Sequence, residues 1–352
     1  MRALENTNLT ALEELPPPRA LKESLPAAAA ATETVLVARA ALREAIHGRD
    51  ARLVAIVGPC SLHDPEAALE YARRLRPIAE ESREDMIVLM RTYFEKPRTT
   101  VGWKGLVNDP RLDGSCDVVR GLSLARELLL QISGLGLPCA TEFLDPITPQ
   151  YLADLVAWAA IGARTAESQT HREMASGLSM PVGIKNGTDG SVQVAIDAVT
   201  AARHPHVFLG VSELGRASVV RTTGNADAHI VLRGGRSGPN WDASAIAAAA
   251  GQLAPLGLAR GVIVDCSHEN SNKQPAQQLA VARALAALGR AGAPALLGVM
   301  IESFLQAGRQ EWKPGGAHAY GLSITDACLG FSETADLLGE LARAWRSERS
   351  AG

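Results

Sequence analysis

Short apolar segments recur along most of the chain. They are separated by stretches in which apolar residues return every three or four positions, the spacing of an amphipathic helix. This alternation is typical of βα units that build a parallel sheet. The eight predicted strands are Leu53–Val57, Met86–Met90, Leu137–Thr141, Trp158–Ala163, Val182–Ile184, His229–Leu232, Val262–Val264 and Leu296–Ile301.

Two of the predicted helices illustrate the pattern. Pro65–Glu80 follows Asp64, a residue type that caps helix N-termini, and begins with proline, which suits the first helical turn. Val118–Ile132 has apolar residues at helical spacing. Eight strands alternating with helices predict an α/β fold, a (β/α)8 TIM barrel. A further apolar run, Val207–Val211, is predicted to form an inserted β-hairpin.

The first 50 residues differ from the rest of the chain. Leu15 precedes three prolines, alanines occupy positions 27–31, and a helix is predicted over Thr34–Ile46. We predict an N-terminal arm over residues 1–50 and a barrel over residues 51–352. The arm has no apolar core of signal-peptide length, and no apolar run reaches membrane-spanning length, so we expect a cytoplasmic protein.

A reactive or charged side chain follows each predicted strand. In a parallel barrel the carboxyl ends of all strands open on one face, where the active sites of this fold are built. These eight side chains would therefore converge on one pocket. They are Cys60, Arg91, Glu142, Arg164, Lys185, Arg233, His268 and Glu302.

Cations are concentrated at this predicted pocket. A pocket lined by so many cations favours binding of an anion, either phosphate or carboxylate. The alternative is that each is an ordinary surface residue. This explanation is reasonable for a single arginine but poor for a set of six cations. Only six of the 35 cations are lysines, so lysine within this set suggests an ammonium that can transfer a proton. The set is Arg91, Lys96, Arg98, Arg164, Lys185 and Arg233.

A second group of side chains suggests a metal site. It combines a thiol, an imidazole and two carboxylates, which suit Mn, Fe, Co or Zn better than Mg or Ca. Their wide separation along the chain makes the signal weak without the barrel, because an isolated buried cysteine is usually a small apolar residue. The four residues are Cys60, His268, Glu302 and Asp326.

Composition narrows the class of protein. The chain has 352 residues, of which 47% are apolar and 21% charged, as in ordinary globular proteins. Its net charge of −3 argues against a nucleic-acid or membrane partner. The five cysteines form no CxxC pair and favour reduced thiols. No Walker A or dinucleotide-binding glycine motif is present, which disfavours a nucleotide cofactor.

The chain closely resembles the class I 3-deoxy-D-arabino-heptulosonate 7-phosphate (DAHP) synthases of the microbial type with an N-terminal regulatory extension. The likeness extends over nearly the whole sequence, and its motifs are together highly specific. They are Gly58-Pro-Cys-Ser61, Arg91-Thr-Tyr-Phe-Glu-Lys-Pro-Arg-Thr99, Gly162-Ala-Arg-Thr165, Glu167-Ser-Gln169, Lys185-Asn-Gly-Thr-Asp-Gly190, Leu232-Arg-Gly-Gly235, Asp265-Cys-Ser-His268 and Ile301-Glu-Ser303.

This resemblance implies a transferase that condenses phosphoenolpyruvate with erythrose 4-phosphate, the first step of the shikimate pathway. Lys96 would protonate the new alkoxide and Glu142 would position water. The implied metal ligands are Cys60, His268, Glu302 and Asp326, of which His268 and Asp326 also count as catalytic. The implied phosphoenolpyruvate residues are Arg91, Lys96, Arg164, Lys185 and Arg233, with Glu142 nearby, and the erythrose 4-phosphate residues are Pro97, Arg98 and Thr99.

Two alternatives to this function are a sibling enzyme and a protein without catalytic activity. A sibling family joins phosphoenolpyruvate to arabinose 5-phosphate, but it carries Lys-Ala-Asn-Arg-Ser where this chain has Lys96-Pro-Arg-Thr99. An inactive effector sensor could keep the fold without the reaction. The complete set of predicted ligands and cations argues against a sensor.

Regulation and assembly are further implications of the resemblance. The family senses an aromatic amino acid through its extension and the nearby barrel surface, and residues Glu167–Met180 look most like the tyrosine-sensitive branch. A homodimer or homotetramer is expected. Cys60 and Cys328 are considered as a redox pair, with an inert buried thiol as the alternative. The predicted effector residues are Asp145, Gln150, Ser179 and Phe208.

Overall fold

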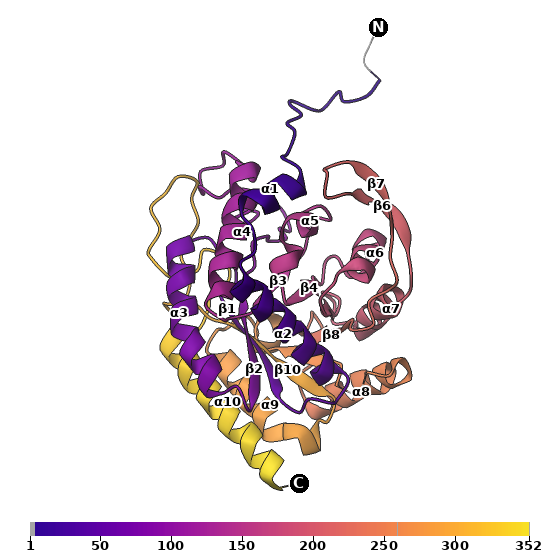
Figure 1. Ribbon diagram of the computed structural model, residues 1–352. Helices are drawn as coiled ribbons and strands as arrows, with labels where there is room; N and C mark the ends of the chain where they lie inside the picture. Colours follow the sequence, from indigo (N-terminus) through magenta and orange to yellow (C-terminus); the bar gives the residue numbers. More distant parts are fainter. Residues whose placement is uncertain (1–3, 259, 352) are drawn as a thin grey trace.

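The computed structural model describes residues 4–258 and 260–351. Within them, eight parallel strands close into a barrel in the order β1-β10-β9-β8-β5-β4-β3-β2 (Figure 1). The predicted (β/α)8 barrel is therefore confirmed. The strands are β1 (Leu53–Gly58), β2 (Met86–Arg91), β3 (Cys139–Glu142), β4 (Trp158–Ile161), β5 (Val182–Lys185), β8 (His229–Leu232), β9 (Val262–Asp265) and β10 (Leu296–Glu302).

Helices surround the barrel, and their ends follow local sequence signals. The side chain of Asp64 accepts a hydrogen bond from the backbone N–H of Ala67, so the predicted cap of α3 is formed. The helices that surround or extend the barrel are α3 (Pro65–Glu81), α4 (Val118–Gly134), α5 (Thr148–Leu152), α6 (Gln169–Gly177), α7 (Val192–Ala202), α8 (Ala243–Leu253), α9 (Gln277–Gly292) and α10 (Phe331–Ala351), with 3₁₀ turns η1 (Ala153–Leu155), η2 (Ala254–Leu256) and η3 (His268–Ser271).

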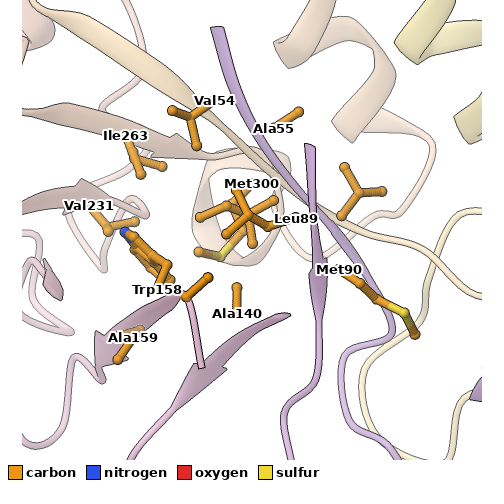
Figure 2. Close-up of a cluster of buried hydrophobic side chains, with 14 of the residues drawn as sticks. Val54, Ala55, Leu89, Met90, Ala140, Trp158, Ala159, Val231, Ile263 and Met300 are labelled. Carbon is orange, nitrogen blue, oxygen red and sulfur yellow. The ribbon is translucent and has the colours of Figure 1, made fainter. Parts of the chain in front are cut away.

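The barrel interior is a packed apolar core. Figure 2 shows Leu89, Met300 and Trp158 among side chains contributed by neighbouring strands. All three are buried. Burial of such side chains stabilises the fold by about 1.5–3 kcal/mol each. The core therefore fixes the strand ends, and with them the side chains that follow.

Two elements are additions to the barrel. β6 (Val207–Val211) and β7 (Ala217–Arg221) pair as an antiparallel hairpin, which confirms the predicted insertion.

The third and fourth barrel strands are shifted or shorter than predicted: β3 begins after Pro138, which lacks an N–H, and β4 ends before the turn at Gly162. No helix among the described residues is long and apolar enough to cross a membrane.

The N-terminal segment has two different parts. Figure 1 shows the segment that begins at Leu4 extending away from the body before the chain enters α1 (Pro18–Ser24). In contrast, α2 (Ala29–Ile46) buries Leu42 and Ile46 completely. Arg39 of α2 donates hydrogen bonds to the carbonyl of Val156, just before β4. Thus α2 covers the amino-terminal end of the barrel, opposite the predicted active site.

A buried histidine makes stability depend on pH. Trp158 donates its indole N–H to Nε2 of His229 (3.1 Å), and Nδ1 of His229 lies 2.9 Å from the carbonyl of Asp227, so the ring is held neutral. Burial lowers the pKa of His229 from 6.5 to about 4. Because the folded state resists protonation, stability is full above about pH 6.5 and is lost as the pH falls towards 4.

We expect the free energy of unfolding to fall by about 2–3 kcal/mol between pH 7 and pH 4.5 on account of His229 alone. Urea unfolding of the wild type and of His229→Gln at both pH values measures this difference. The variant should lose that part of the pH dependence, whereas His204→Gln, at an exposed histidine, should keep it. Equal slopes for wild type and His229→Gln would contradict the assignment.

Candidate active site

A cavity of about 510 Å³ opens at the carboxyl ends of the barrel strands. It contains most of the predicted site residues, although these are spread over more than 230 positions of the sequence. Cys60 and Glu302 lie deeper, beside it. The predicted residues that line the cavity are Arg91, Lys96, Pro97, Arg98, Thr99, Glu142, Arg164, Lys185, Arg233, His268 and Asp326.

Three predicted metal ligands form a compact group. Ligand atoms of Cys60, Glu302 and Asp326 lie within 4.8 Å of one another, and Sγ of Cys60 is 3.4 Å from Oδ2 of Asp326. The fourth, His268, lies at the edge of this group, with Nε2 4.0 Å from Oε1 of Glu302. This donor set of sulfur, nitrogen and carboxylate oxygen fits a divalent transition ion.

The Cys60 thiol is protonated in the absence of metal. Burial, with a contribution from Glu302, raises its pKa to about 12. Since a metal binds the thiolate, ion binding would release this proton and depend on pH. Cys328, considered as an oxidation partner, is also a buried free thiol.

Lys96 reaches the metal-ligand group from the loop after β2. Its Nζ donates hydrogen bonds to Sγ (3.1 Å) and to the carbonyl oxygen (3.2 Å) of Cys60. Burial disfavours the charged form, but Cys60, Glu302 and Asp326 outweigh it and raise the pKa of Lys96. Lys96 is therefore an ammonium, the form that a proton donor requires.

Arg91 is a fully buried cation with spare hydrogen-bonding capacity. Its Nη2 donates to Oε1 of Glu302 (3.0 Å), and its guanidinium carbon lies 3.9 Å from the ring centre of Tyr93. Its Nη1 is buried and has no hydrogen-bond partner among the residues that the structure describes. A buried donor without a partner is costly, so an anionic ligand at this position would gain a strong, charge-assisted hydrogen bond.

Glu142 and Lys185 form a buried ion pair on the same cavity wall. Nζ of Lys185 donates to Oε2 of Glu142 (2.8 Å). Burial alone would raise the pKa of Glu142, but Lys185 outweighs it and keeps this pKa below its usual value. Gly162 is required beside this pair, because a Cβ there would lie 2.6 Å from Oε1 of Glu142.

The outer part of the cavity is more exposed. Nη2 of Arg164 donates to Oγ1 of Thr99 (3.2 Å), which joins the loop after β2 to the loop after β4. Arg98 is exposed beside Thr99, whereas Arg233, after β8, is buried. The structure thus separates a buried inner set of cations from two exposed outer arginines, Arg98 and Arg164.

Two buried carboxylates near the site were not singled out from the sequence. Oδ2 of Asp265 lies 2.9 Å from Nδ1 of His268, which is also 2.7 Å from the Ser267 hydroxyl, and Nε2 is left towards Glu302. Glu95 precedes Lys96 and accepts hydrogen bonds from the backbone N–H of Asp145 (3.1 Å). Burial raises the pKa of Glu95 to about 8. Asp265 and Glu95 lie within the Asp265–His268 and Arg91–Thr99 motifs, and this is the sequence signal that could have identified them as site residues.

The four predicted effector residues occupy separate elements. Asp145 follows β3, Gln150 lies in α5 and Phe208 lies in β6. Ser179 lines a different cavity, of about 450 Å³, together with residues of α2 and of the segment before β8. The segment before α2 does approach α5, since the Tyr151 hydroxyl donates to the carbonyl of Pro16 (2.9 Å).

A parallel barrel with a transition-metal donor set and several cations at the carboxyl ends of its strands is typical of metal-dependent enzymes that act on small anionic substrates. Comparison with known proteins specifies the class further. A model of the DAHP synthetase I family matches residues 27–338. The chain belongs to this family.

Relatives share the whole length of the chain. The Phe-sensitive phospho-2-dehydro-3-deoxyheptonate aldolase of Escherichia coli K12 is 51% identical over 98% of both chains. The Tyr-sensitive aldolase of the same strain is 49% identical over 96% of this chain and 95% of that one. The solved structure of the Francisella tularensis SCHU S4 aldolase is 46% identical, covers 96% of this chain and 99% of its own, and superposes with a TM-score of 0.93.

These findings establish a transferase that synthesises 3-deoxy-7-phosphoheptulonate. The arabinose 5-phosphate alternative and the inactive-sensor alternative are therefore not supported. Membership of the family implies a divalent metal ion and feedback by an aromatic amino acid. Identities of 51% and 49% to Phe- and Tyr-sensitive relatives are too similar to assign the effector.

Proposed function

We propose that the cavity at the carboxyl-end mouth is where phosphoenolpyruvate, erythrose 4-phosphate and water are converted to DAHP and phosphate. The observation that carries this assignment is the juxtaposition of cations that line the cavity with the metal-ligand group, which reaches the cavity through Asp326. Two phosphorylated substrates account for more cations than one anion would need.

The metal would be held by Cys60, Glu302 and Asp326, with His268 completing the set. Mn²⁺, Fe²⁺, Co²⁺ and Zn²⁺ suit these donors. When bound, such an ion supplies Lewis acidity towards the aldehyde oxygen of the sugar. Ser267, which lies 2.7 Å from Nδ1 and donates to Asp265, would keep the His268 ring in place together with the nearby Asp265 carboxylate.

Phosphoenolpyruvate would bind the inner cations, because these are buried and already held in position. The free Nη1 of Arg91 supplies one charge-assisted hydrogen bond. Lys185 stays an ammonium because Glu142 opposes the effect of burial on its pKa. The inner set also includes Lys96 and Arg233, and Arg164 would close over the ligand from the outer part.

Erythrose 4-phosphate would bind beside the loop of Pro97, Arg98 and Thr99. Attack by C3 of the enol phosphate on the aldehyde carbon forms the new C–C bond, and Lys96 would donate a proton to the resulting alkoxide. Glu142 would position the water that adds at C2, after which the C2–O bond to phosphate breaks. Orientation of both substrates in one cavity accounts for much of the rate.

An assay of phosphoenolpyruvate absorbance with erythrose 4-phosphate tests this assignment. Protein stripped by a chelator should be inactive, and Mn²⁺ should restore turnover. Tyrosine, phenylalanine and tryptophan, each added in turn, identify the effector, for which we propose tyrosine. Absence of turnover with every divalent metal would contradict the proposed reaction.

We also propose that residues 1–50 act as a regulatory and oligomerisation arm on the barrel of residues 51–352, in a cytoplasmic homodimer or homotetramer. Contacts between residues 16–25 and the barrel support the arm. Pro16 accepts a hydrogen bond from Tyr151, and Arg19 pairs with Glu213 in the hairpin turn. The effector would bind among Asp145, Gln150, Ser179 and Phe208.

Phe208→Ala is expected to raise the effector concentration for half-inhibition by about tenfold, because it removes a large apolar contact from the proposed pocket. Turnover without effector should change little, since β6 lies outside the barrel. Leu209→Ala is the matched control, because Leu209 is its neighbour on β6 and is 87% exposed. Equal inhibition of Phe208→Ala and wild type would remove Phe208 from the effector site.

A further inference from the structure

Glu269 lines the active-site cavity and has no part in the proposed reaction. Its Oε1 lies 3.1 Å from Nζ of Lys273 and 3.9 Å from Nη2 of Arg233. A carboxylate therefore stands beside a cation assigned to an anionic substrate. Glu142 and Asp326, the other acidic residues that line this cavity, already have proposed roles.

The backbone holds Glu269 firmly against the Arg233 loop. Glu269 lies in the short turn η3, and the backbone N–H of Lys273 closes this turn on the carbonyl of His268 (2.7 Å). Gly234 has a φ of +70°, and a Cβ there would meet the backbone of Glu269 at 2.9 Å. The backbone of Glu269 therefore cannot shift far from Arg233 when a ligand arrives.

The two cations beside Glu269 differ in freedom. The Lys273 side chain is 69% exposed and can turn away into solvent, whereas the Arg233 side chain is 10% exposed and stays in the cavity. A phosphate that binds Arg233 therefore meets the Glu269 carboxylate at close range. Since Glu269 is itself only 28% exposed, water screens this repulsion incompletely.

We propose that Glu269 sets the affinity of the phosphate subsite at Arg233: it is a fixed counter-anion that weakens binding of phosphoenolpyruvate and of the product phosphate. This inference rests on the proposed placement of the substrate at Arg233. The carboxylate partly neutralises Arg233 in the empty site and competes with the entering phosphate. A weaker phosphate subsite also allows inorganic phosphate to leave sooner.

Glu269→Gln tests the charge while keeping the shape. Calorimetric titration of the full-length protein, loaded with Mn²⁺ and without aldose, should show phosphoenolpyruvate and inorganic phosphate binding about five- to tenfold more tightly than to wild type. Pyruvate, which lacks the phosphate, should bind within about twofold of wild type. The matched control is Glu311→Gln, which removes an 80% exposed carboxylate paired with Lys313 and should leave both affinities unchanged.

Three outcomes would overturn the inference. Unchanged or weaker phosphate binding by Glu269→Gln would exclude a counter-anion. Tighter binding of pyruvate to the same extent would place the effect at the carboxylate of the substrate. A raised KM for erythrose 4-phosphate with unchanged phosphate affinity would make Glu269 a ligand of the sugar.

Arg233→Met separates this inference from the proposed function. If it weakens phosphoenolpyruvate binding while Glu269→Gln does not tighten it, the substrate placement stands and only the inference fails. If Arg233→Met leaves binding unchanged, the placement itself is wrong. Measured metal content of each variant controls for damage to the neighbouring His268.

Discussion

Lys96→Met is expected to lower kcat by about 10³-fold or more while leaving metal content intact. The ammonium is the proposed proton donor to the new alkoxide, and loss of such a group costs about 10²–10⁴-fold. Its Nζ lies 3.1 Å from Sγ of Cys60, so its removal takes a positive charge away from the metal-ligand group. Metal binding should therefore be kept or strengthened, and the defect should appear in turnover.

Single-turnover kinetics and metal analysis of the dialysed protein measure the two quantities separately. Lys104→Met is the matched control: Lys104 belongs to the same loop, its carbonyl accepts the backbone N–H of Lys96, and its side chain is exposed. That variant should retain near wild-type kcat. A near-normal rate for Lys96→Met would remove Lys96 from the mechanism.

Cys60→Ala is expected to bind divalent metal more than about 100-fold more weakly, and turnover should be lost with it. Cys60 supplies the only sulfur atom of the compact group that it forms with Glu302 and Asp326. Even residues that only orient a metal ligand contribute about 10–100-fold to metal affinity, so loss of a ligand should cost at least as much. Calorimetric titration of chelator-stripped protein with Mn²⁺ or Zn²⁺ measures the affinity without an activity assay.

Cys328→Ala provides the comparison. Its thiol is also buried and donates to the carbonyl of Asp326 (3.6 Å), but it is not among the clustered ligand atoms. Metal affinity of this variant should stay within about threefold of wild type. Retention of stoichiometric metal and full turnover by Cys60→Ala would contradict the proposed ligand set.

Much of the fold could be predicted from local patterns. Strands β1, β2 and β10 read as apolar runs because parallel strands in a barrel are buried on both faces. The helix cap at Asp64 could be predicted because it requires only one side chain and one nearby backbone N–H. Strand ends were less certain, as β3 shows, since pairing with neighbours decides where a short strand begins.

The residue types of the candidate site could also be predicted, because each follows a strand. The interaction partners of these side chains could not be predicted. Arg91 pairs with Glu302, 211 positions away, and Lys185 pairs with Glu142. Glu269 could not be predicted as a site residue, because a lone glutamate after a histidine has no distinctive pattern. Its closeness to Arg233 follows only from the packing of the turn against Gly234.

By itself, the sequence determined that the chain alternates strand and helix and that reactive side chains follow the strands, because periodicity and turn residues act over short range. Tertiary structure alone decided the distances and protonation states. Closure of the barrel pairs Gly58 of β1 with Glu302 of β10, which brings Cys60 into the metal-ligand group. Burial and the nearby Glu302 carboxylate then hold Cys60 as a thiol, and the negative charges around Lys96 outweigh its burial and hold it as an ammonium.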